Sequence, residues 1–246
     1  MKTITITIIT IILLAYHFVS AKDFNASLFG IRSDGTTQNT GSIQKAIDYI
    51  SENGGGCLVF YVGRYLTGTI QLKSNVSIRL EEGAILVGTA LVYDYSGVNG
   101  NKAILLADGQ QNIGISGKGV IDGQGEKLME QINQQIQKDY LKETVSQASP
   151  ALIMMNNCTR IAIDGINLVN GCGNAQAFHG CKELSIKGVT TRSTVSQNSG
   201  GIFLSGCDSV AIRDSFFDTS GKEIQADGNS KNISVINCVN ANGKKF

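Results

Sequence analysis

The side chains that could do nucleophilic or acid–base chemistry lie in the C-terminal third of the chain. His179 and Ser205 each stand two residues before a cysteine, and Asp227 occupies a similar position farther along. Brought into one column, the three could in principle act as base, nucleophile and orienting carboxylate. Nothing in the sequence indicates what would orient the imidazole or bind an oxyanion. We therefore expect outward-facing polar side chains here rather than a catalytic triad.

The elements that would position these side chains repeat between residues 157 and 237. Four copies of a short unit begin with small polar residues and continue with two apolar residues separated by one position. The anchors of the copies are 23, 26 and 23 positions apart; they are Ile161, Leu184, Val210 and Ile233, with Val76 and Ile113 anchoring two earlier turns. Such a period, with alternation inside each copy, is typical of a solenoid of strands. The copies lack the leucine-rich consensus of a horseshoe, so the sequence predicts an all-β parallel β-helix.

The cysteines raise the question of disulfide bonds. Cys158, Cys181 and Cys207 occupy the same position in three successive repeats. Equivalent positions on neighbouring strands are about 4.8 Å apart, so these thiols would form a column. We expect a ladder of small, half-buried thiols rather than bridges, although the redox state stays open. No Cys/His pairing typical of zinc is present, and we expect neither a metal nor a cofactor.

The N-terminal residues are typical of a secretory signal peptide. Lys2 precedes an apolar run, Ile4 to Leu14, and a small-residue cleavage site ends at Ala21. The run is too short to span a membrane. Cleavage would leave one domain, residues 22–246, in a secreted or periplasmic protein. Without Lys2 the 21 basic residues become 20, equal to the 20 acidic ones, so neither nucleic acid nor a membrane surface is an expected partner.

Two helical segments are expected beside the strands. Apolar residues spaced three and four apart predict a helix over residues 42–51, which would cap the open N-terminal end of the solenoid. Residues 126–146 have apolar residues every four positions from Leu128 to Tyr140, which predicts a helical insertion on the outside. This insertion could act as a lid over a groove. Early strands are expected at residues 22–29, 57–61 and 65–72.

Four local patterns occur in a fixed order along the chain. They are Leu28-Phe29-Gly30 with Ser33-Asp34-Gly35-Thr36 and Ile43-Gln44-Lys45-Ala46-Ile47, then Gly54-Gly55-Gly56 with Tyr65-Leu66-Thr67-Gly68, then Leu72-Lys73-Ser74-Asn75-Val76, and then Gly119-Val120-Ile121-Asp122-Gly123-Gln124-Gly125. As an ordered set they resemble the polygalacturonases, glycoside hydrolase family 28. The resemblance implies a right-handed, single-stranded parallel β-helix that hydrolyses α-1,4-galacturonosyl links of pectic polysaccharide with inversion. It also implies three aspartates, a histidine and an Arg/Lys pair on one outward face.

The C-terminal half departs from the family's catalytic motifs. The chain has Asn198-Ser199-Gly200 in place of Asn-Thr-Asp, and Gly221-Lys222 in place of paired aspartates. It has Gly243-Lys244-Lys245 in place of Gly-His-Gly, and the family's Arg-Ile-Lys would lie beyond Phe246. Glycine and lysine cannot supply the acid and the base. The resemblance therefore implies a polygalacturonase-like protein whose hydrolytic activity is in question.

Glu223 and Asp227 are the carboxylates that could substitute. An inverting glycosidase needs two carboxyl groups about 6.5–9.5 Å apart. Four residues apart on one face of one strand, these two would be separated by about 13 Å. Together with His179 they are the remaining catalytic candidates, and we expect structural roles for them.

Six residues are candidates for binding sugar, and Phe203 is the one aromatic among them that we expect on the outward face. They are Asn198, Phe203, Ser205, Gln225, Lys222 and Lys244. Three functions remain open: a pectin-directed hydrolase, a non-catalytic β-helix that binds pectic polysaccharide or oligosaccharide, and a structural chain. The missing acids favour the second function over the first. The third gains from the ending at Phe246, which predicts self-association through an open C-terminal end.

Overall fold

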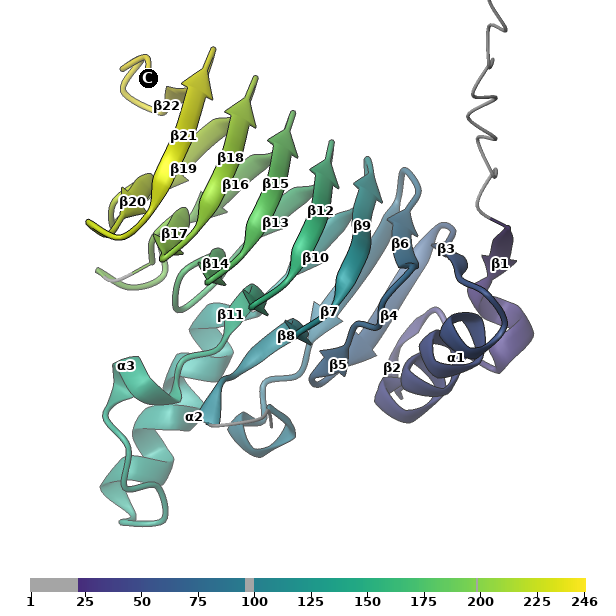
Figure 1. The fold of residues 1–246 in the computed structure, drawn as a ribbon. Coiled ribbons are helices and arrows are strands. Elements are labelled where there is room, and N and C mark those ends of the chain that lie inside the picture. Colours follow the sequence, from purple (N-terminus) through teal and green to yellow (C-terminus); the bar gives the residue numbers. More distant parts are fainter. Residues whose placement is uncertain (1–21, 96–99, 198) are drawn as a thin grey trace, which may run out of the picture.

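Three parallel sheets wind around one apolar core in this protein (Figure 1). The structure, a computed structural model, describes residues 22–95, 100–197 and 199–246. The segment expected to be a signal peptide, residues 1–21, and the sugar-binding candidate Asn198 lie outside these residues. The parallel β-helix predicted from the repeats is confirmed.

Each turn of the solenoid contributes one strand to each sheet in most of the structure, and every neighbouring pair is parallel. Sheet A contains β1 (Asp23–Asn25), β3 (Gly56–Phe60), β6 (Val76–Leu80), β9 (Gln111–Gly117), β12 (Thr159–Asp164), β15 (Lys182–Lys187), β18 (Asp208–Arg213) and β21 (Lys231–Ile236). Sheet B contains β2 (Asp34–Gln38), β4 (Gly63–Thr67), β7 (Ala84–Gly88), β10 (Val120–Asp122), β13 (Asn167–Val169), β16 (Thr190–Ser193), β19 (Phe216–Thr219) and β22 (Val239–Asn240). Sheet C contains β5 (Ile70–Gln71), β8 (Ala103–Asp108), β11 (Ala151–Asn156), β14 (Gln176–His179), β17 (Ile202–Ser205) and β20 (Ile224–Ala226).

The repeat anchors pair in register across sheet A, as the sequence period predicts. Ile161 lies beside Leu184, Leu184 beside Val210, and Val210 beside Ile233. Burial alternates along these strands, so one row of side chains enters the core and the next row faces solvent. This alternation fixes the register, because a shift by one residue would turn every apolar side chain outward.

The cysteine ladder is confirmed. Cys158, Cys181 and Cys207 are free and fully buried at the corner between sheets C and A. Their thiols donate to main-chain carbonyls; that of Cys181, for example, lies 3.3 Å from the Met155 oxygen. Burial is more complete than the half-buried expectation, because each thiol packs against the residue of the preceding turn and the core beneath it.

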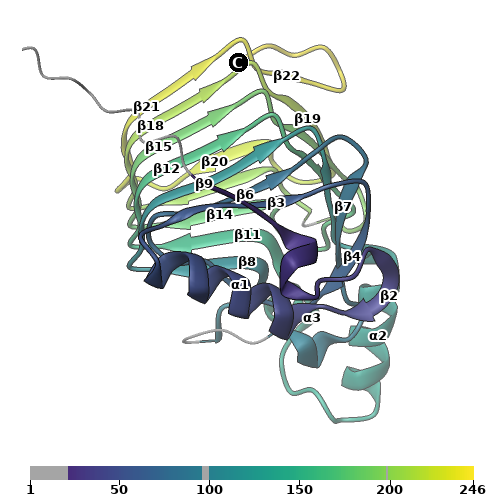
Figure 2. The ribbon, with the colours of Figure 1, turned by 90° about the vertical axis from the view of Figure 1, so that its right-hand side faces the viewer.

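The predicted capping helix is confirmed as α1 (Thr40–Glu52) at the N-terminal end of the solenoid (Figures 1 and 2). Its buried face consists of Ile43, Ala46, Ile47 and Ile50. The side chain of Gln44 exchanges two hydrogen bonds with the main chain of Gln71, which fixes the helix to β5. No helix among the described residues combines the length and apolar character needed to cross a membrane.

Two early strands differ from their predicted ranges. The expected strand over 22–29 is only β1, followed by the 3-10 helix η1 (Ala26–Phe29), because the Asn25 side chain accepts the Ser27 N–H and turns the chain. The expected strand over 65–72 divides into β4 and β5. It breaks where Gly68 donates its N–H to the Thr40 hydroxyl and the chain turns from sheet B into sheet C.

The helical insertion is present but consists of two helices. They are α2 (Gly125–Gln137) and α3 (Val145–Ala148), and both lie outside the solenoid near β8 and β11 (Figure 1). Leu128 and Ile132 are buried as predicted, whereas Tyr140 is 71% exposed. The helix ends before Tyr140 because Asp139 adopts a left-handed backbone, with φ of 59°.

Candidate functional site

The outward face of sheet C carries two parallel rows of side chains. On β17, Ile202 and Leu204 enter the core, so Phe203 and Ser205 face outward. Strand pairing extends these positions into two rows. The first row is Leu106, Met154, Ala177, Phe203 and Gln225; the second is Asp108, Asn156, His179 and Ser205. Because the rows run across the strands, a ligand bound along them would contact one residue per turn of the solenoid.

The predicted column of His179, Ser205 and Asp227 exists, but its hydrogen bonds are not those of a nucleophile and base. His179 and Ser205 are paired neighbours, and the Ser205 hydroxyl donates to Asp227 Oδ2 over 2.8 Å. Within the described residues, no hydrogen bond joins the imidazole to Ser205. The His179 ring instead lies 5.6 Å from the Phe203 ring, and burial lowers the pKa of the imidazole against the opposing influence of Asp227. The hydroxyl is therefore a donor to a carboxylate and is not activated.

Asp227 organises the turn that follows β20. Its carboxylate accepts hydrogen bonds from the Gly206 N–H, the Ser205 hydroxyl and the Ser230 hydroxyl. These donors, the Gly206 N–H foremost, lower the pKa of Asp227 to about 2. A carboxylate that accepts hydrogen bonds from its own turn and from the neighbouring turn of the solenoid is a structural group.

Replacing Asp227 by asparagine is expected to destabilise the protein only where the wild-type group is ionised. The folded-state pKa lies below the ordinary value of 3.8, so the stabilisation is fully present above 3.8 and is lost as the pH falls toward about 2. Urea unfolding of wild type and Asp227→Asn at pH 7, 4 and 2 measures this. A difference in unfolding free energy that is the same at all three pH values would contradict the assignment.

Glu223 directly precedes β20 (Ile224–Ala226), whereas Asp227 directly follows it. The two carboxylates therefore flank this strand rather than sharing one face of it. The Asn240 side-chain amide donates to Glu223 Oε1 over 2.5 Å and, as the leading cause, lowers the pKa of this carboxyl. Each carboxylate therefore has its own local partners, and neither aims at the other.

A pocket of about 250 Å³ includes Gly200, Gly221 and Lys222, the positions at which the sequence leads us to expect the family's acidic motifs. We call it the Lys222 pocket; its lining residues are Asn174, Gln197, Gly200, Gly221, Lys222 and Gln225. They come from the loops before β14, β17 and β20 and from β20 itself. Among the described residues that line this pocket there are amides, glycines and one ammonium group, but no carboxylate.

Asn174 occupies the space that an acidic side chain at position 200 would need. A Cβ atom on Gly200 would stand 2.4 Å from Asn174 Oδ1. Successive main-chain hydrogen bonds place the two residues on neighbouring turns, since the Ala175 N–H donates to the Gly200 oxygen. Because residue 200 is glycine, the side-chain amide of Asn174 has room to lie across it.

The remaining sugar-binding candidates divide between this pocket and other places. Gln225 lines the Lys222 pocket, and Phe203 is the next residue of the same row. Ser205 is engaged with Asp227. Lys244 lies away from the pocket lining, with its ammonium group 4.8 Å from the centre of the Phe246 ring.

A second cavity, of about 340 Å³, lies between the helical insertion and sheet C. We call it the insertion cavity. It is lined by Met129 of α2, residues 145–147 of α3, Lys102, Ala151, Met154 and Ala177, among others, and it shares Asn174 with the Lys222 pocket. The sequence singled out only the insertion, residues 126–146, as a possible lid; the other lining residues were not identified, because they come from separate loops and strands. Asn174 and Gln197 of the Lys222 pocket were also missed, although Gln197 directly precedes the Asn198-Ser199-Gly200 motif.

No cluster of three or more His, Cys, Asp or Glu side chains suited to a metal ion occurs in the described part of the chain. The Lys222 pocket offers amide side chains and one unpaired ammonium group, which suits binding of polar, anionic ligands, while Asp108 and His179 lie in the second row of the same sheet.

Comparison with known proteins agrees with this architecture. The chain is 29% identical to an exo-poly-alpha-D-galacturonosidase of Dickeya chrysanthemi over 89% of its own length and 40% of that protein. It thus spans less than half the length of this relative. The crystal structure of a candidate glycosyl hydrolase from Parabacteroides merdae is 44% identical, with a TM-score of 0.86, over 92% of this chain and 98% of the other.

A more distant structure shares the fold. The polygalacturonase of Erwinia carotovora is 22% identical, with a TM-score of 0.70, over 85% of this chain and 61% of the other. The family model described as Glycosyl hydrolases family 28 matches residues 59–244. That match covers well over half of the chain. The chain therefore belongs to family 28 of the glycosyl hydrolases and is polygalacturonase-like.

Proposed function

We propose that this protein binds acidic oligosaccharides of the pectic type along sheet C and does not hydrolyse them through the family's carboxylate pair. The observation that carries the proposal is the lining of the Lys222 pocket, where the described residues include a lysine and three amide side chains but no carboxylate. Inverting hydrolysis needs both a carboxylic acid and a carboxylate beside the scissile bond.

Two observations support this class of ligand: the positive charge of the Lys222 pocket and the activity for which a relative is named. Lys222 is exposed and has no ion-pair partner among the described residues, so its ammonium group is available to a uronate carboxylate. Asn174, Gln197 and Gln225 can donate to and accept from sugar hydroxyls. A relative of this chain is named for action on polygalacturonate. Export directed by residues 1–21 would bring the protein to such polysaccharides.

Hydrolysis by substitute carboxylates is the weaker alternative. Glu223 is bonded to Asn240, and Asp227 is bonded to Ser205, Gly206 and Ser230. Neither carboxylate lines the Lys222 pocket. Using either as acid or base would require breaking these contacts, and the lowered pKa of each opposes protonation near neutral pH.

An equilibrium titration tests the binding proposal. We expect saturable heat on titrating the protein with a de-esterified oligogalacturonate, and little or none with a neutral galacto-oligosaccharide of the same length. Raising the salt concentration should weaken the first interaction, because a charge pair at an exposed site is screened. Equal affinity for both ligands, or no binding of either, would contradict the proposal.

A further inference from the structure

The insertion cavity and the Lys222 pocket lie on the same sheet and share a lining residue. Asn174 lines both of them. Lys102 directly precedes β8 and Lys222 lies just before β20, so four strand spacings, or about 19 Å, separate the two lysines across sheet C. An oligosaccharide of that length lying across the strands would reach from one lysine to the other.

The insertion cavity offers hydrogen-bonding groups suited to a sugar. Beside Lys102, its lining includes the amides of Asn101, Gln147 and Asn174 and the hydroxyl of Ser146. Among the described residues, no hydrogen bond within the protein uses the side-chain amides of Asn101 and Asn174. Both amides can donate to and accept from sugar hydroxyls.

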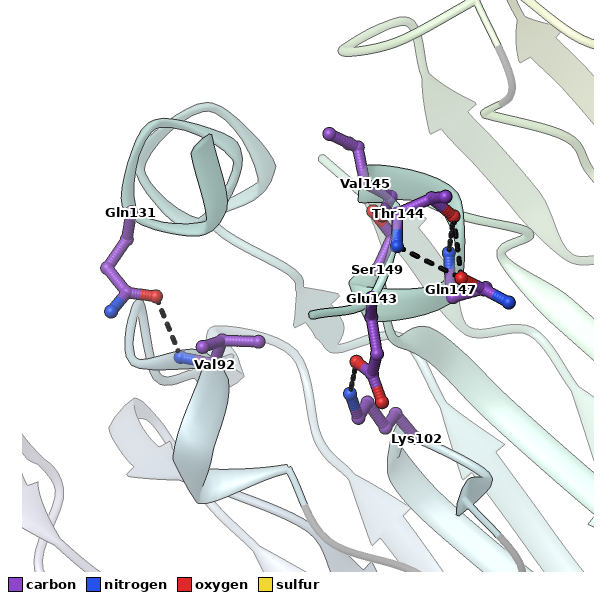
Figure 3. A network of polar contacts seen from close by, with 8 residues as sticks. All are labelled: Val92, Lys102, Gln131, Glu143, Thr144, Val145, Gln147 and Ser149. Carbon is purple, nitrogen blue, oxygen red and sulfur yellow. Dashed lines mark hydrogen bonds and ion pairs between the residues drawn. The ribbon is translucent and has the colours of Figure 1, made fainter. Parts of the chain in front are cut away.

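Lys102 is the cation of this cavity, and most of its side chain is withdrawn from solvent. The side chain is 14% exposed, and its ammonium group donates to the carboxylate of Glu143, whose side chain is 40% exposed (Figure 3). An ammonium group so far out of water needs a counter-charge, because an unpaired buried charge is costly. Lys102 lines the cavity whereas Glu143 does not. The pair therefore shows that a carboxylate fits beside the one cation of the cavity lining.

Contacts other than this ion pair hold the insertion in place. Leu128 and Ile132 of α2 are buried. Gln131 of α2 accepts the N–H of Val92 over 3.1 Å (Figure 3). Glu143 lies between α2 and α3, and its partly exposed side chain can return to water. Replacing its carboxylate beside Lys102 by another one would leave the other contacts of the insertion intact.

We infer that the insertion cavity is a second uronate subsite, in which a carboxylate of the ligand takes the place of Glu143 beside Lys102. This inference rests on the proposed function, because it adds a second anchoring point for the same bound oligosaccharide. Glu143 is then an internal competitor that weakens binding of the ligand. The exchange keeps one anion beside one cation, so its electrostatic cost is small. A neutral sugar would gain nothing from Lys102.

The test is titration of the full chain with a de-esterified oligogalacturonate long enough to span about 19 Å. Glu143→Gln removes the competing carboxylate and should tighten binding about two- to fivefold, the range expected for loss of a partly exposed ion pair. Asp139→Asn is the matched control. It changes the net charge equally on the same insertion, and Asp139 pairs with Lys142 where both side chains are at least 74% exposed. We expect this control to leave the affinity unchanged.

A second background separates competition at Lys102 from loosening of the insertion. Lys102→Gln removes the cation of the subsite and should weaken binding, and adding Glu143→Gln to it should then bring no gain. An affinity in Glu143→Gln that equals that of Asp139→Asn, or falls below that of wild type, would overturn the subsite while leaving the proposed function intact. An equal gain from Glu143→Gln with and without Lys102 would overturn it as well. Failure of wild type to bind the oligogalacturonate would overturn both.

Discussion

Lys222→Glu is expected to weaken binding of a de-esterified oligogalacturonate by at least about tenfold, which corresponds to about 1.4 kcal/mol. The substitution replaces the one ammonium group of the Lys222 pocket by a carboxylate, so an attraction becomes a repulsion. The side chain is exposed, and solvent screening keeps the effect well below that of a buried pair. Titration at low and at physiological salt measures the change in the dissociation constant.

The matched control is Lys182→Glu. Lys182 begins β15 on the outer face of sheet A, is exposed, and lies on a different sheet from the Lys222 pocket. It changes the net charge of the protein by the same amount. If both variants lose affinity equally, the ligand senses only overall charge, and the assignment of the pocket is wrong.

Gly117→Ala is expected to cost about 3 kcal/mol or more in free energy of unfolding, or to prevent folding. Gly117 ends β9 beside Leu80 of β6, in the middle of sheet A. Its φ is +109°, and a Cβ atom would stand 2.0 Å from the Leu80 carbonyl oxygen. Main chain cannot move aside without separating two central strands. Urea unfolding followed by far-ultraviolet circular dichroism measures the loss.

Gly109→Ala separates the steric cost from the conformational one. Gly109 also has a positive φ, +64°, but no atom lies within 4 Å of where its Cβ would stand. We expect this variant to lose only about 1 kcal/mol, the cost of placing alanine in a left-handed conformation. Similar losses for both variants would show that the close approach of β6 and β9 is not what requires glycine at position 117.

Much of the fold could be predicted because it is built from local periodicity. The anchors of successive repeats, such as Leu184 and Val210, pair in register as their spacing predicts. The helix over 42–51 was identified from its apolar face, which is the face that α1 buries. What failed were the ends of elements, where a local feature decides the path, as with the side-chain hydrogen bond at Asn25 and the left-handed backbone at Asp139.

The site was harder to predict, because its residues converge from separate turns. The spacing of His179, Ser205 and Asp227 correctly predicted a column, but not that the Ser205 hydroxyl would donate to Asp227. Asn174 joins the two cavities, yet nothing near it in the sequence distinguishes it from other turn asparagines. Lys102 and Glu143 are 41 residues apart, and only the folding of the insertion brings them together.

The most direct test of binding without hydrolysis is to measure new reducing ends released from polygalacturonate and from oligogalacturonates, at ligand concentrations that saturate the protein in titration. We predict no release above that of a protein-free blank over hours at pH 5 and pH 7. Release that scales with protein concentration and disappears in Glu223→Gln or Asp227→Asn would contradict this prediction and would identify that carboxylate as part of a relocated catalytic pair.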